Sequence, residues 1–265
     1  MPAIPFSSAL KPLVDFIYPP RCPLCGEGTA AGPGLCGACW DTLDFPGEPA
    51  CTQCQTPLET AAMGSICTAC HLHRPEHAGI AAAMLYNDPA RQLVLRFKHG
   101  GRIGLAKLMG RLIAARLVNA PADAVLIAVP LHRVRLWMRG YNQAALLARA
   151  ISTHTGMAVM VDGLKRTRAT PKLGGLGRKQ RAKVLRGAIR VNEARAASIR
   201  GRHVVLVDDV LTSGATSSAC VRALLVAGAK SVRIACFARV ADQSTSDIAT
   251  PKHETPETAK VPGAA

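Results

Sequence analysis

The sequence predicts an α/β protein in which helices flank a parallel sheet and a small cysteine-rich module comes first. Two short apolar runs, residues 125–129 and 204–207, have the length and the β-branched content of buried parallel strands. Each run is followed by a polar loop and then by a helical pattern, which is the order of elements in such a sheet. Four Cys-x-x-Cys pairs lie upstream of both runs.

The 265 residues are enough for one medium domain and a smaller one. We expect an N-terminal helix in residues 1–21, a cysteine module in 22–79, the α/β domain in 80–240 and a disordered tail in 241–265. No apolar run approaches the about 18 residues of a membrane span, and the N-terminus lacks the pattern of a secretory signal. The expected location is therefore cytoplasmic.

Positive charge is concentrated in the middle of the chain. The net charge is +16, and residues 81–240 hold 28 Lys and Arg against six Asp and Glu. Such a concentration attracts polyanions, so nucleic acid or an anionic membrane surface is an expected partner, and a solvated basic surface is the alternative. The aromatics within basic segments are Phe97, Trp137 and Tyr141, and we expect them to pack in the core rather than to stack on bases.

The cysteine pairs predict metal sites. Gaps of 10, 11 and 12 residues separate successive pairs, and two Cys-x-x-Cys turns complete one tetrahedral site. Eight thiolates suit two structural zinc ions, with no open position for catalysis. Sequential pairing is favoured over an interleaved one, and an iron–sulfur cluster is a further alternative. The expected ligands are Cys22, Cys25, Cys36 and Cys39 at one site, and Cys51, Cys54, Cys67 and Cys70 at the other.

The most informative stretch is residues 204–228. An apolar run is followed by Asp208 and Asp209, then by a small hydroxyl-rich turn, and then by a helix that Gly228 ends. A helix N-terminus binds phosphate, and carboxylates accept hydrogen bonds from a diol or hold a divalent cation. The order of residues therefore predicts a ribose 5-phosphate site. Its residues are Asp208, Asp209, Thr212, Ser213, Gly214, Ala215 and Thr216.

This stretch, VLVDDVLTSGAT, resembles the phosphoribosyl diphosphate signature of type I phosphoribosyltransferases. The resemblance implies their parallel-sheet fold, and it assigns Asp208 and Asp209 to the ribose and residues 212–216 to the phosphate. In an active transferase the two acids, with Mg²⁺ bound alongside the ligand, would be the catalytic residues. A P-loop site is excluded, because no G-x-x-x-x-G-K-[ST] string occurs.

Residues 124–154 predict a strand, a basic loop and a helix capped by Asn142. In phosphoribosyltransferases such a loop holds pyrophosphate, so the resemblance points to Arg139 and Gly140, with the amides of Asn142 and Gln143. A surface basic loop is the alternative. Residues 161–202 are basic and glycine-rich, as is the mobile hood of these enzymes. A basic arm that folds on nucleic acid would have the same composition.

Over residues 10–240 the chain resembles the ComF family (ComFC- and GntX-like competence proteins). The strings that carry the resemblance are the cysteine pairs, LRFKHGG, VPLHR, RGYNQA and the phosphoribosyl signature. The chain departs from the family pattern at Leu173, where the family has Gln, and at Lys183, where the family has Asn.

The family implies a protein that binds phosphoribosyl diphosphate and handles internalised single-stranded DNA in natural transformation. Implied partners are a DNA-uptake helicase or channel proteins and a peripheral contact with the inner membrane. Two alternatives stay open: an active phosphoribosyltransferase of the nucleobase-salvage kind, and a regulator that senses the metabolite and binds DNA.

Overall fold

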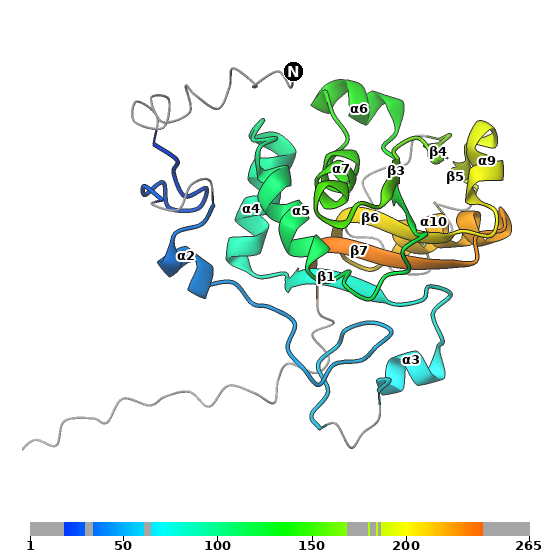
Figure 1. The fold of residues 1–265 in the computed structure, drawn as a ribbon, viewed down its shortest axis with the longest axis horizontal. Helices are drawn as coiled ribbons and strands as arrows, with labels where there is room; N and C mark the ends of the chain where they lie inside the picture. The colour runs from blue at the N-terminus through cyan, green and yellow to red at the C-terminus, as the bar shows by residue number, and fades with distance from the viewer. Residues whose placement is uncertain are drawn as a thin grey trace, which may run out of the picture.

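The computed structural model describes residues 19–29, 34–60, 65–168, 180, 184 and 187–240. Its centre is a five-stranded sheet of order β1-β7-β6-β2-β3, in which every neighbouring pair is parallel (Figure 1). The predicted parallel sheet is therefore confirmed. The strands are β1 (Ile80–Leu85), β2 (Val125–Ala128), β3 (Ala158–Met160), β6 (His203–Leu211) and β7 (Ser231–Arg239).

Helices cover both faces of this sheet. On one face lie α4 (Asp88–His99), α5 (Leu105–Ala114) and α7 (Gln143–Thr155). On the other lie α9 (Glu193–Ile199) and α10 (Ala215–Val226), beside a small antiparallel pair formed by β4 (Leu164–Arg166) and β5 (Ile189–Val191). The short helices are α2 (Gly37–Asp41) and α3 (Thr68–Leu72) in the cysteine module, and α6 (Arg133–Arg139) after β2.

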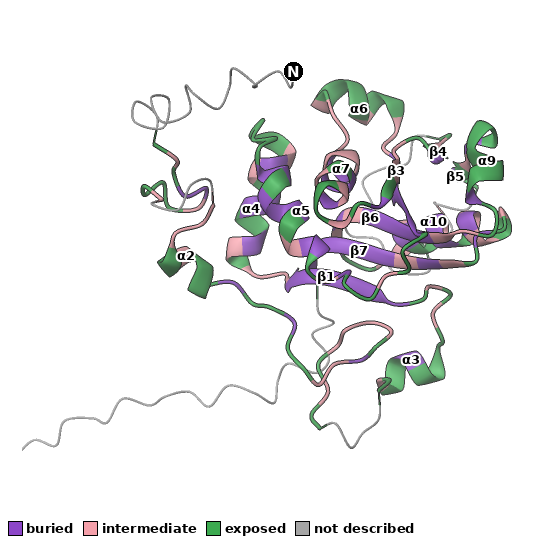
Figure 2. Ribbon diagram, in the orientation of Figure 1, coloured by how far each residue is buried: buried purple, intermediate pink, exposed green. Residues whose placement is uncertain are grey.

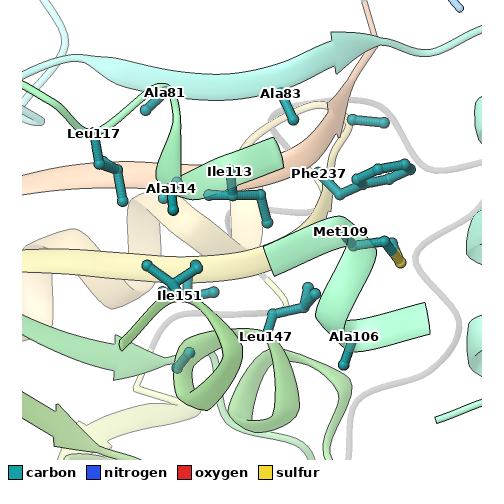
Figure 3. Packing of buried hydrophobic residues seen from close by; sticks show 14 of the residues in the cluster. Ala81, Ala83, Ala106, Met109, Ile113, Ala114, Leu117, Leu147, Ile151 and Phe237 are labelled. Atoms are coloured by element: carbon teal, nitrogen blue, oxygen red, sulfur yellow. The ribbon is translucent and has the colours of Figure 1, made fainter. Parts of the chain in front are cut away.

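The alternation of side chains along β6 divides the core into two layers. Val205 and Val207 pack with the layer of α4, α5 and α7, whereas Val204 and Leu206 pack with the layer of α10. In the first layer α5 lies between β7 and α7, with Met109 and Ile113 facing Phe237 and Leu147 (Figure 3). Burial follows the sheet and the inner sides of these helices (Figure 2).

Several predicted boundaries are wrong, and tertiary contacts explain them. The strand predicted to end at Val207 runs to Leu211, because pairing with β7 continues to Arg239. The predicted basic loop after β2 is instead the helix α6.

Other expectations lie outside the described residues. These are the N-terminal helix, the substituted positions Leu173 and Lys183, and the C-terminal tail. The hood predicted over residues 161–202 is wrong at both ends of that stretch, because β4 lies near its start and β5 and α9 lie near its end. Within the described ranges, no helix is both long and apolar enough to cross a membrane.

Candidate phosphoribosyl site and metal centres

The predicted phosphate turn connects β6 to α10. Gly214 has a φ of +69°, a left-handed conformation that favours glycine, and α10 starts at the next residue. No side chain caps the first turn of α10, so its backbone N–H groups are oriented to receive an anion. Thr212 and Ser213 are exposed beside it and can add hydroxyl donors. The turn has the parts that a bound phosphate needs.

The two acids lie within β6, near its carboxyl end, rather than after it. Because adjacent residues of a strand face opposite sides, their carboxylates have different surroundings. Asp209 lies on the α4 side, where its Oδ2 is 3.0 Å from Lys98 Nζ. Asp208 lies on the side of the α10 layer, within electrostatic range of Arg166 of β4 and Cys220 of α10.

The surroundings of Asp208 favour the protonated form of its carboxyl group. Burial and the neighbouring charge of Asp209 together raise the pKa of its carboxyl to about 7, against the opposing effects of the Asp209 backbone N–H, Lys98 and Arg166. The only hydrogen bond shown to its carboxylate among the described residues is donated by Asp209 N, at 2.9 Å. A carboxyl group that titrates near neutral pH at the end of a sheet is typical of a functional site.

The predicted pyrophosphate residues lie at the junction of α6 and α7. Gly140 is left-handed and ends α6, and Arg139 donates a hydrogen bond to Gln143 Oε1 at 3.2 Å. Gln143 is buried, and its Nε2 has no hydrogen-bond partner in the described structure. Asn142 is engaged locally, since its Oδ1 accepts from Ala144 N and its Nδ2 donates to Val129 O. Its side-chain amide therefore caps α7 and does not face a ligand.

Two further arginines lie near the acids. Burial has the largest effect in lowering the pKa of Arg166, and the charge of Arg135 has the second largest. The charge of Asp208 raises the same pKa. Arg135 of α6, Arg166 of β4 and Asp208 of β6 therefore share one region of the molecule. A pair of close guanidinium groups favours an anion between them.

Sequence reasoning selected neither Lys98 nor Arg166 as a site residue. Lys98 lies in the last turn of α4, more than one hundred residues before Asp209, and only the packing of α4 on the sheet brings them together. Arg166 stands in a basic segment where its charge does not distinguish it from its neighbours. A signal for Lys98 existed only in the LRFKHGG string of the family resemblance.

The eight predicted ligands gather in two groups of four. Within each group the sulfur atoms lie within 4.8 Å of one another, in the sequential order and not the interleaved one. Thiolates at about 2.3 Å from a tetrahedral zinc ion stand about 3.8 Å apart. The Cys25–Cys36 and Cys54–Cys67 sulfur distances of 3.5 and 3.6 Å fit that geometry. Both groups are suited to structural zinc, with all four positions taken by protein.

The second cysteine group is attached directly to the edge of the sheet. Gln55 Oε1 accepts a hydrogen bond from Ala82 N of the edge strand β1, at 2.7 Å. Thr56 Oγ1 lies 3.0 Å from Cys54 Sγ and accepts a bond of 2.9 Å from Arg239 of β7. These contacts satisfy part of an otherwise open strand edge and connect the metal ligands to the sheet.

Two family models match separate parts of the chain. The Double zinc ribbon domain matches residues 13–71, and the Phosphoribosyl transferase domain matches residues 141–258. The DNA utilization protein YhgH of Salmonella typhimurium is 30% identical over 225 residues, which cover 78% of this chain and 97% of the relative. Competence protein F of Haemophilus influenzae is 29% identical over 226 residues, covering 83% and 96%.

A more distant relative is the competence protein ComFC of Bacillus subtilis, 25% identical over 215 residues, covering 72% of this chain and 84% of the relative. Among solved structures, the phosphoribosylpyrophosphate synthetase of Mycobacterium smegmatis is 18% identical with a TM-score of 0.33, covering 51% of this chain and 35% of that one. The glutamine phosphoribosylpyrophosphate amidotransferase of B. subtilis is 20% identical with a TM-score of 0.37, covering 53% and 30%. The chain thus spans about a third of each of these two structures.

Proposed function

The chain belongs to the ComF family of competence and DNA utilization proteins, and from that premise we propose that it binds phosphoribosyl diphosphate and acts on internalised single-stranded DNA. The observation that carries the first part is the uncapped start of α10, preceded by the hydroxyl-rich turn and by the acids of β6. A phosphate, a diol and a divalent cation would each find a suitable group there.

In this proposal the 5-phosphate lies on residues 212–216 and the ribose hydroxyls lie at Asp208 and Asp209. The pyrophosphate lies towards the α6–α7 junction at Arg139 and Gly140, where Arg135 and Arg166 add positive charge. The buried Nε2 of Gln143 is a further donor without a partner among the described residues. Mg²⁺ would accompany the ligand and neutralise part of its charge, and the carboxylates of β6 are the oxygen ligands it prefers.

Calorimetric titration of phosphoribosyl diphosphate with Mg²⁺ tests this site. We expect the wild type to bind and Asp208→Asn/Asp209→Asn to lose at least about tenfold in affinity, because each hydrogen bond to a charged group contributes about 1.5–3 kcal/mol. Asp162→Asn is the matched control, since Asp162 is a half-exposed acid whose carboxylate pairs with Arg195 of α9. Ser213→Ala should weaken binding less than the double variant.

Two results would contradict the proposal. One is a wild type that shows no heat of binding at millimolar ligand. The other is a double variant that binds as tightly as the Asp162→Asn control. Titrations with ribose 5-phosphate and with inorganic pyrophosphate then separate the two halves of the site, because the first should depend on the turn and the second on Arg139.

A transferase activity is the second candidate, and the raised pKa of Asp208 favours it. A carboxyl that exchanges its proton near pH 7 can serve as a general acid or base. Release of pyrophosphate from phosphoribosyl diphosphate in the presence of each nucleobase would establish turnover. If phosphoribosyl diphosphate binds but no nucleobase causes pyrophosphate release, the protein is a binding module and not a transferase.

A further inference from the structure

The helix α6 exposes an apolar face to solvent. Val134 is 56% exposed, Trp137 86% and Met138 74%, and their spacing places them on one side of the helix. The expectation that Trp137 packs in the core is therefore wrong. Figure 2 shows α6 as a projecting, largely exposed element above α7. A group of apolar side chains on one exposed face is typical of an interaction site, whereas a single exposed apolar residue is not.

Local contacts hold this helix in place. His132 Nδ1 accepts a hydrogen bond from Val134 N, and the left-handed Gly140 ends the helix. The hydroxyl of Tyr141, the next residue, donates a hydrogen bond to Phe97 O. The rings of Tyr141 and Phe97 also pack together, with 6.2 Å between their centroids. The apolar face is thus presented by a fixed element that is joined to α4.

The charge around this face selects the class of partner. Arg133 and Arg135 flank Val134 in the sequence, and residues 124–161 contain no Asp or Glu. Through Arg166, Arg135 also lies near Asp208, so the surface borders the candidate ligand site. A positively charged surface without a nearby acid binds a polyanion more favourably than it binds an uncharged protein surface.

We propose that the exposed face of α6, with Trp137 as a stacking platform and Arg133 as a phosphate contact, binds single-stranded nucleic acid. An unpaired base offers a flat face to an exposed indole, and its neighbouring phosphates suit the arginines. A duplex keeps its bases stacked and paired, so Trp137 would contribute little there. This inference rests on the DNA-handling part of the proposed function and adds the residues that make the contact.

Other occupants fit the surface less well. Membrane binding by an interfacial helix increases with the apolar area that it buries, and the seven residues of α6 present only three side chains on this face. A stable protein interface buries about 800 Å² on each partner, which is more than three side chains on two helical turns supply. A flexible polyanion needs only a few contacts on this element and can continue over the basic surface beside it.

The test uses the full-length zinc-loaded protein and a fluorescein-labelled oligothymidylate of about 12 nucleotides. We expect Trp137→Ala to weaken binding at least about fivefold by fluorescence anisotropy, and Trp137→Phe to keep most of the affinity. Val226→Ala, at an equally exposed site on α10, is the matched control and should bind as the wild type does. Calorimetry with phosphoribosyl diphosphate checks that the variants are folded.

Salt dependence separates the arginine contact from general charge. Arg133→Gln should reduce the slope of log affinity against log salt by about 0.7, the value for one phosphate contact on a single strand. Arg222→Gln removes an equal charge from α10, where Arg222 pairs with Glu76, and should leave the slope unchanged. In a Trp40→Phe background, emission from Trp137 should be quenched when the oligonucleotide binds.

The outcomes are distinguishable from failure of the nucleotide site. Oligonucleotide binding that is equal in the wild type and Trp137→Ala would overturn this inference and leave the proposed function intact. A wild type that binds phosphoribosyl diphosphate but no oligonucleotide would overturn both the inference and the DNA part of that function. A blue shift of Trp137 emission with phosphatidylglycerol vesicles, and no response to oligonucleotide, would assign the face to a membrane instead.

Discussion

Lys98 Nζ lies 3.0 Å from Asp209 Oδ2, and this ion pair joins the end of α4 to the carboxyl end of β6. The side chains are 22% and 11% exposed, so water screens the pair only in part. The lysine balances one of two adjacent carboxylates whose repulsion would otherwise oppose the fold. It also means that one acid of the candidate site already has a cationic partner.

A double-mutant cycle on this pair should show strong coupling. We expect Lys98→Met and Asp209→Asn each to lower the free energy of unfolding by about 1–3 kcal/mol, because each leaves a partly buried charge without its partner. The double variant should cost less than the two losses together, by about 1–2 kcal/mol. Urea unfolding measures these values. The exposed Arg195–Asp162 pair is the control, with coupling below about 1 kcal/mol, and equal coupling in both cycles would contradict the prediction.

Asp208 should make stability fall as pH rises. Its pKa is raised to about 7 in the folded protein, whereas an unfolded aspartate titrates near about 3.9. Between these values the folded state keeps a proton that the unfolded state has lost, so unfolding becomes easier with rising pH, by up to about 1.4 kcal/mol per unit. Above the folded pKa, Asp208 is ionised in both states, so this group no longer changes stability as the pH rises.

The variant that tests this is Asp208→Asn. Compared with the wild type, it should be nearly equal in stability at pH 4 and more stable at pH 8, as measured by urea unfolding across that range. Asp162→Asn, at a half-exposed acid, controls for loss of one negative charge. Parallel stability curves for Asp208→Asn and the wild type would show that Asp208 is ionised in the folded protein throughout.

The close crossing of α5 and α7 depends on Gly110. A Cβ built at Gly110 would lie 2.5 Å from Ala150 Cβ and 3.1 Å from its backbone carbonyl carbon, so the helices would have to separate. Although alanine favours helix formation, we expect Gly110→Ala to lower stability by about 1–3 kcal/mol through overpacking. Gly104→Ala, where no atom lies within 4 Å of the new Cβ, should be close to neutral. Thermal unfolding of both variants decides the point.

The two cysteine groups should affect the sheet differently. Cys54→Ala removes a ligand beside Thr56, which bonds to Arg239, so loss of its metal should release contacts on β1 and β7. We expect faster amide hydrogen exchange at Ala82, whose N–H is bonded to Gln55. Zinc content should fall from two ions to one.

Cys25→Ala is the matched variant in the first group. It should also lose one zinc ion, but exchange at Ala82 should stay slow, because no contact of Cys25 in the described structure reaches β1. Equal exchange at Ala82 in the two variants would mean that the second group does not stabilise the strand edge.

The sequence by itself determined the elements whose signal is local. Apolar runs of strand length predicted β2 and β6, and the spacing of the cysteine pairs predicted two groups of four. The turn after β6 and the cap at Asn142 were also predicted, since each depends on a few adjacent residues. Glycine in the left-handed region and amide capping act within one turn of the chain.

Only the tertiary structure decided the relations between distant residues. Whether β6 stops at Val207 or runs to Leu211 depends on pairing with β7, and that extension turns Asp208 and Asp209 to opposite faces. Lys98 reaches Asp209 because α4 packs on the sheet, and Trp137 is exposed because α6 projects from it. These outcomes follow from packing energies summed over many side chains, which no local pattern contains.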